Sequence, residues 1–198
     1  MPTPGKKWRH IIFSTHNSWL PGDPCGFWNR DHRIHSSGDY KNPPPKGEHA
    51  GLHRYAKKIS GAPVVLENEI RETIGLAIIA ELKKQGCRVL AIAVAATHVH
   101  ILCELPDDES EWRAIVGRCK TAACYAVRKQ KPGRLWGRNA TYKPIDDRSH
   151  HANTFRYILG QAGAWTWSFK EEGGADDTES NEVDGKDDKG AKNDEPTS

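Results

Sequence analysis

The order in which helical and strand-like segments follow one another is the feature that most constrains this chain. Four segments have the apolar pattern of β-strands, and three segments of helical periodicity fall between or after them. The order is strand, helix, strand, strand, helix, strand, helix. Helices that fall between antiparallel strands indicate an α+β fold of the ferredoxin-like kind, an antiparallel sheet with packed helices.

The boundaries of these segments follow from apolar spacing and from stop signals such as Gly86, Pro106 and Gly133. We expect strands at 7–15, 88–95 and 98–105, a short strand or hairpin within 135–145, and helices near 67–85, 110–131 and 150–164. Residues 17–65 are rich in Gly, Pro, His and aromatic residues. A segment this long and irregular usually carries function or is disordered, and a short helix is expected at 51–60.

Charge is distributed unevenly along the chain. Residues 171–198 contain 11 acidic and 3 basic side chains, which leaves 15 acidic and 26 basic side chains in residues 1–170. The acidic segment has no apolar periodicity, so we expect one domain at 1–170 and a disordered acidic tail at 171–198. A basic body favours polyanions as partners, because they release counterions on binding.

Composition also argues against several classes of protein. The longest apolar run, 89–96, is far shorter than the roughly 20 residues of a membrane span, so we expect no membrane partner. The first residues contain no secretory signal. Five cysteines without a CxxC pair argue against a disulfide framework and fit a reducing cytoplasm.

The strand at 98–105 contains two histidines that can act together. Side chains at i and i+2 of a strand point to the same face, so His98 and His100 project side by side, while Val99, Ile101 and Cys103 face a core. Two imidazoles at this spacing can share a metal ion. The alternative is a pair of half-exposed strand histidines with no ligand role.

The last predicted helix carries a second pair of reactive residues. Tyr157 and Gln161 lie four positions apart and therefore on one helix face. A tyrosine hydroxyl can act as a covalent nucleophile, and a glutamine amide oxygen can complete a metal shell. The alternative is a tyrosine at the margin of the core and an ordinary surface glutamine.

Together these motifs resemble a known family. HVHILCEL at 98–105 and RYILGQ at 156–161 are similar to the single-tyrosine HUH transposases, the insertion-sequence-200-like class and its repeat-associated relatives. HIIFSTHNSWL resembles the first strand of that family, and RLWGRNATYKPI the segment before its tyrosine helix. The resemblance covers roughly 8–161, and relative to the family residues 17–65 look like an enlarged or divergent insertion. It implies an HUH endonuclease fold, with His98, His100 and Gln161 as metal ligands and Tyr157 as the catalytic nucleophile.

The resemblance also implies a reaction. Members of the family cut single-stranded DNA through a 5′-phosphotyrosine link and a free 3′-OH, which then rejoins strands during DNA transposition. Nitrogen and oxygen ligands without thiolate suit Mg²⁺ or Mn²⁺ better than structural Zn²⁺. We therefore expect a cytoplasmic, nucleoid-associated enzyme that binds single-stranded or hairpin DNA. Some members of the family are homodimers, so a homodimer is a further expectation.

Basic residues supply candidate contacts to the phosphates of DNA. Trp136 and Tyr142 either stack on unpaired bases or belong to the core. The cations that we expect to bind nucleic acid are Lys120, Arg128, Lys129, Arg134, Arg138 and Lys143.

Three alternatives compete with these assignments. Tyr125 is a rival nucleophile, although its small neighbours favour a core role. A zinc site in the insertion is a weaker hypothesis, because its spacing matches no common zinc pattern. The third is a non-catalytic module of the same fold that binds DNA or RNA hairpins. The residues of the zinc hypothesis are Cys25, His32, His35, His49 and His53.

Overall fold

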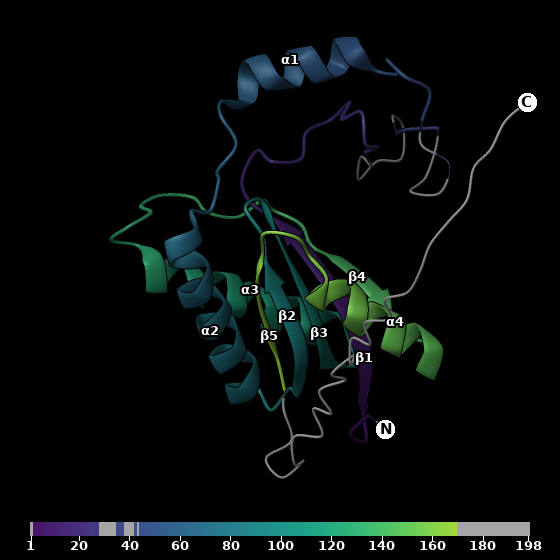
Figure 1. The fold of residues 1–198 in the computed structure, drawn as a ribbon, viewed down its shortest axis with the longest axis vertical. Coiled ribbons are helices and arrows are strands. Elements are labelled where there is room, and N and C mark those ends of the chain that lie inside the picture. The colour runs from purple at the N-terminus through teal and green to yellow at the C-terminus, as the bar shows by residue number, and fades with distance from the viewer. Residues whose placement is uncertain (1, 28–34, 38–41, 43, 170–198) are drawn as a thin grey trace, which may run out of the picture.

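A five-stranded antiparallel sheet forms the centre of the molecule in a computed structural model that describes residues 2–27, 35–37, 42 and 44–169 (Figure 1). The strand order is β4-β1-β3-β2-β5. Its first four positions have the order of a ferredoxin-like sheet, so the predicted fold class is confirmed. The strands are β1 (Lys6–Ser14), β2 (Val89–Val94), β3 (His98–Pro106), β4 (Thr141–Pro144) and β5 (Trp165–Ser168).

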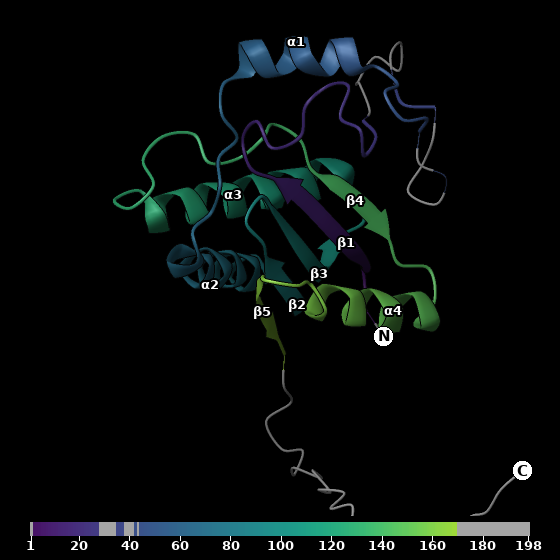
Figure 2. The same cartoon turned by 45° about the horizontal axis from the view of Figure 1, so that its top comes forward.

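Helices cover both faces of this sheet. Helices α2 and α3 lie on one face and α4 lies on the other, while α1 stands apart from the sheet beyond one end of the strands (Figures 1 and 2). The larger core lies between the sheet and the helices α2 and α3, and a smaller core lies between the sheet and α4. The helices are α1 (Ala50–Ser60), α2 (Asn68–Lys84), α3 (Glu109–Val127) and α4 (Arg148–Leu159).

Side chains of β3 alternate between the two cores. Val99, Ile101 and Cys103 are fully or almost fully buried in the larger core, as the alternation predicts. Leu102 faces the other way and packs with Ile158 of α4 in the smaller core. The central strand is therefore fixed from both sides, which sets the positions of its polar residues.

The main differences from the predicted elements lie near the carboxyl end. Helix α4 ends at Leu159, with Gly160 as its C-cap, rather than near residue 164. The chain then turns back and forms β5 beside β2, a strand that the sequence analysis did not predict. Its four residues are too few for a clear alternation, and pairing with β2 stabilises the strand.

The insertion and the tail are described only in part. Helix α1 is present where a short helix was expected. The predicted acidic tail at 171–198 lies outside the described residues, so its disorder stays a prediction. In the part of the chain that the structure describes, no helix has the length and apolar character to cross a bilayer.

A close contact between α2 and β5 makes one glycine sensitive to substitution. A Cβ atom at Gly75 would lie 2.0 Å from Cζ3 of Trp165. We expect Gly75→Ala to lower the free energy of unfolding by about 1–3 kcal/mol, because the indole must shift. Gly117→Ala on α3 is the matched control, since nothing lies within 4 Å of its Cβ, and it should stabilise by up to about 1 kcal/mol. Urea unfolding measures the change in stability of both variants. Equal changes would contradict the close contact between Gly75 and Trp165.

Candidate active site

His98 and His100 lie side by side on β3, on the face that α4 covers. Their ring centroids are 4.8 Å apart and the ring planes are nearly perpendicular, at 86°. His100 is buried, at 5% exposure, whereas His98 is half-buried. The predicted common face of the two histidines is therefore confirmed.

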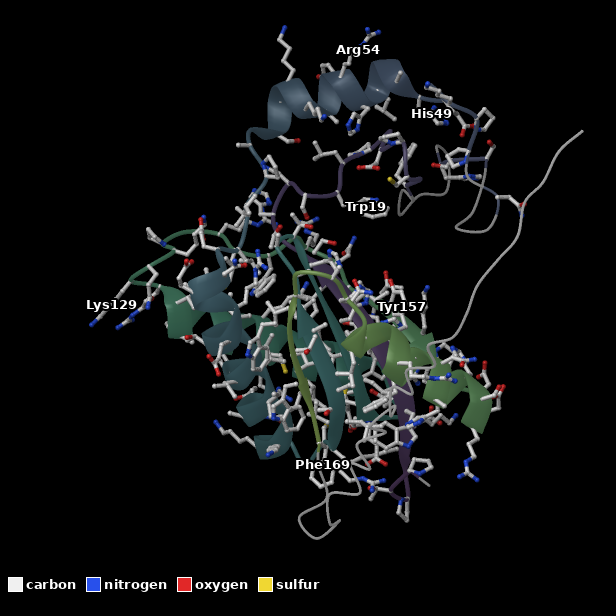
Figure 3. The ribbon with its side chains drawn as sticks, viewed as in Figure 1. Trp19, His49, Arg54, Lys129, Tyr157 and Phe169 are labelled. Carbon is white, nitrogen blue, oxygen red and sulfur yellow. The ribbon has the colours of Figure 1, made fainter. Side chains whose placement is uncertain are left out.

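Helix α4 brings the tyrosine to these histidines. Asp147 caps the start of the helix by accepting a hydrogen bond from the His150 N–H at 2.7 Å. The fully buried Ile158 holds the helix against the sheet. The adjacent Tyr157 has its ring centroid 5.3 Å from that of His100, yet its side chain is 53% exposed (Figure 3). The phenol therefore lies beside the histidines and within reach of solvent.

Gln161 completes the group at the end of α4. Its side chain lies close enough to His98 to raise the pKa of that imidazole by hydrogen bonding, and its Nε2 donates to the carbonyl oxygen of Tyr157 at 3.3 Å. The four predicted residues thus meet within one chain: two come from β3, Tyr157 comes from α4, and Gln161 lies just beyond the C-cap of α4. The prediction that Tyr157 and Gln161 share a helix face is wrong, because the helix ends at Leu159. Their catalytic and metal-binding roles, and the homodimer, stay predictions.

The sequence analysis missed a fifth residue of this cluster, His10. It lies on β1 and is 6% exposed. Its Nε2 is 2.9 Å from Nδ1 of His100, and its ring centroid is 6.0 Å from that of Tyr157. The sequence did contain a signal for it: Ile11 and Phe13 of the same strand face the larger core, so strand alternation places His10 on the opposite face, where His98 and His100 lie. Without the pairing of β1 with β3, however, its distance from His100 was unknown.

Burial keeps the histidines of the cluster neutral. It lowers the pKa of His10 from 6.5 to about 4, with help from the positive charge of Lys143 and from His150. Burial, followed by His10 and His98, lowers the pKa of His100 to about 3. Burial also lowers the pKa of His98, while the hydrogen bond with Gln161 acts in the opposite direction. A neutral imidazole can offer a lone pair to a cation.

The donor atoms of the cluster fit a hard divalent cation. One nitrogen of each ring is engaged, because Nδ1 of His100 contacts His10 and Nδ1 of His98 lies 3.3 Å from Oγ1 of Thr97. A cation would replace the contact between His98 and Gln161 and would bind the other nitrogen of each ring and the Gln161 amide oxygen. The described residues contain no group of three or more His, Cys, Asp or Glu that could hold a metal ion.

The zinc hypothesis for the insertion gains no support. Nε2 of His49 contacts the carbonyl oxygen of His35 rather than sharing a site with Cys25 or His53. His32 lies outside the described residues. This part of the insertion therefore shows no metal-ligand geometry.

Of the cations predicted to bind nucleic acid, Lys143 lies close enough to His10 and His100 to lower the pKa of both. It pairs directly with His10 in the β1–β4 register, and the following Pro144 ends β4. Lys120 instead donates to the carbonyl oxygens of Gly137 and Asn139, at 3.1 and 2.9 Å.

The remaining predicted cations belong to the end of α3 and the loop after it. Lys129 lies far from Tyr157, on the other side of the sheet (Figure 3). The backbone before Arg138, however, reaches the sheet near the histidines: the N–H of Gly137 donates to the carbonyl oxygen of Ser14, the strand partner of His98, at 2.9 Å. The group comprises Arg128, Lys129, Arg134 and Arg138.

Three aromatic side chains take positions that the sequence left open or predicted wrongly. Trp136 is 5% exposed and Tyr142 packs on Trp112 at a centroid distance of 3.9 Å, so both belong to the core. The core role for Tyr125 is wrong, because its side chain is 65% exposed. It lies off the buried stripe of α3, with the guanidinium of Arg128 6.0 Å from its ring centroid.

Comparison with known proteins gives distant structural neighbours. No protein-family model matches the chain, and no curated protein does. It is similar to a candidate transposase from Deinococcus radiodurans R1, at 15% identity and a TM-score of 0.43, over 79% of this chain and 91% of that one. It is also similar to a REP-associated tyrosine transposase bound to a REP hairpin, at 14% identity and a TM-score of 0.40, over 80% and 67%. Both neighbours are of the kind that the HUH resemblance implied, but these values carry no function to this chain.

The lowered pKa values predict a stability that falls in mild acid. Between pH 6.5 and 4 the unfolded chain binds a proton at His10 that the folded chain does not bind, and His100 behaves in the same way. The free energy of unfolding should therefore decrease as the pH falls, by up to about 1.4 kcal/mol per pH unit for each histidine. Urea unfolding at pH 7 and pH 5 measures the decrease. The decrease should be smaller in His10→Leu than in the wild-type protein. An equal decrease in both would show that the pKa of His10 is not lowered by folding.

Proposed function

We propose that the chain is a metal-dependent single-strand DNA endonuclease and strand transferase of the transposase type, with Tyr157 as its nucleophile. The observation that carries this proposal is the convergence of His98, His100, Tyr157 and Gln161 around one position on the sheet. The ring centroid of His100 lies 4.8 Å from that of His98 and 5.3 Å from that of Tyr157, and the phenol is exposed to an incoming DNA strand.

The chemistry of phosphodiester cleavage explains why these groups belong together. A phosphodiester is anionic, and a phenol with a pKa near 10 is mostly protonated at neutral pH. A divalent cation held by His98, His100 and Gln161 would polarise the scissile phosphate and orient it for in-line displacement. Tyr157 therefore has to reach the phosphorus of the phosphate that this cation would bind. The short distance between the rings of His100 and Tyr157 supports this requirement.

The reaction exchanges one phosphoester bond for another, so the bond energy is conserved. The oxygen of Tyr157 bonds to phosphorus, the P–O3′ bond breaks, and the departing 3′ oxygen takes up a proton while the phenol loses one. The products are a 5′-phosphotyrosine and a free 3′-OH. A second 3′-OH can reverse the step and join two strands without ATP. The positive charge of Lys143 beside the histidines favours the approach of a phosphate.

Replacement of the tyrosine tests the nucleophile. Incubation of the wild-type protein with Mn²⁺ and hairpin-bearing single-stranded DNA should give a covalent protein–DNA adduct on a denaturing gel. Tyr157→Phe should form no adduct, because it lacks the attacking oxygen, and it should bind the DNA within about twofold of wild type. Tyr125→Phe, which removes an exposed tyrosine of another helix, is the matched control and should form the adduct normally.

Other outcomes separate the alternatives. An adduct at the wild-type level in Tyr157→Phe would assign the nucleophile to another residue. If the wild-type protein binds the hairpin but forms no adduct on any DNA tested, the chain is a non-catalytic binding module of the same fold.

Metal removal tests the ligand set. EDTA should abolish the adduct and leave hairpin binding in place, since cleavage and not binding needs the cation. Gln161→Leu should raise the Mn²⁺ concentration for half-maximal adduct formation by about tenfold or more, because it removes a ligand oxygen. The adduct is quantified across a Mn²⁺ titration. An unchanged midpoint would remove Gln161 from the metal shell.

A further inference from the structure

His10 is the member of the cluster with no role in the proposed reaction. It comes from β1, the strand beside β3, and it lies diagonally across the pair from His100, because the partner directly opposite His10 is Leu102. A hydrogen-bond contact joins its Nε2 to Nδ1 of His100, at 2.9 Å, and both rings are buried.

A single proton must lie between these two nitrogens. Two N–H groups cannot face each other at this distance, and two bare nitrogens would leave a buried contact without a hydrogen. Either Nδ1–H of His100 donates to His10, or Nε2–H of His10 donates to His100. The charged groups and titratable side chains around the pair are Lys143 of β4, His98 of β3, and His150 and Tyr157 of α4.

The two arrangements differ in what His100 can do. If His100 donates from Nδ1, its Nε2 on the other side of the ring keeps a bare lone pair. If His10 donates, Nε2 of the neutral His100 carries the hydrogen and cannot bind a cation. Ligand histidines generally donate their second N–H to a neighbouring acceptor, which fixes the tautomer and the ring orientation.

We infer that His10 is a positioning residue that accepts the Nδ1–H of His100 and so keeps Nε2 of His100 free for a divalent cation. The hydrogen bond also holds the ring plane of His100, which lies between His98 and Tyr157 in the cluster. The inference rests on the proposed function in one respect, because it treats His100 as a metal ligand. The tautomer itself is a property of the metal-free chain.

Nitrogen-15 NMR of the histidine rings tests the tautomer directly, without metal or DNA. In the wild-type protein His100 should be protonated at Nδ1 and bare at Nε2. His10→Gln places an amide oxygen near the position of Nε2 and should keep this state. His10→Leu removes the acceptor and should shift His100 toward the Nε2–H tautomer. A wild-type His100 with hydrogen on Nε2 would overturn the inference.

Binding of Mn²⁺ alone gives the second measurement. Calorimetry should show affinity reduced by about 10–100-fold in His10→Leu and by no more than about threefold in His10→Gln. His151→Leu is the matched control: its ring packs on Trp8, 5.0 Å between centroids, on the same face of the sheet, and its affinity should equal that of wild type. Urea unfolding confirms that each variant is folded. A folded His10→Leu with wild-type Mn²⁺ affinity would overturn the inference.

The two proposals fail in different ways. If the tautomer and the Mn²⁺ affinities behave as stated but no DNA gives an adduct, the positioning role holds and the proposed function fails. If the adduct forms at Tyr157 while His100 carries its hydrogen on Nε2, the proposed function holds and the positioning role of His10 fails.

Discussion

The alternation of side chains along β3 is the constraint on which the rest of the molecule depends. Val99 and Ile101 fill the larger core, while Leu102 joins the smaller core under α4. Because both faces are packed, the strand cannot shift by one residue without burying its polar side chains in the wrong layer. The apolar residues that alternate with His98 and His100 therefore fix the positions of the two histidines, so the geometry of the cluster follows from how the core packs.

The fold and most of the cluster could be predicted because they depend on local periodicity. Spacing of two on a strand put His98 and His100 on one face. The spacing of four did not describe how Gln161 lies near Tyr157, because α4 ends at Leu159 and Gln161 lies beyond its C-cap. The meeting of these four residues depends on tertiary packing, which only the motif resemblance supplied. His10 was missed because its neighbour depends on the register of β1 against β3, which no local pattern encodes.

Other failures have the same origin. Strand β5 is a strand because β2 offers an unpaired edge, and its own four residues give only a weak signal. The small neighbours of Tyr125 suggested burial, but exposure on a helix depends on angular position, and this side chain lies off the buried stripe of α3. Lys120 has a long flexible side chain, so its position on the chain did not show that its amine binds two backbone carbonyls.

The lengths of the strands limit how copies of this protein can associate. The outermost strands of the sheet, β4 and β5, have four residues each, whereas the interior strands β1 and β3 have nine. Pro144 also removes one N–H donor from the β4 edge. Short edges of this kind offer little template for intermolecular backbone pairing, which protects a protein against edge-to-edge aggregation. Any stable association of two copies would therefore have to use side-chain surfaces rather than a continuous sheet.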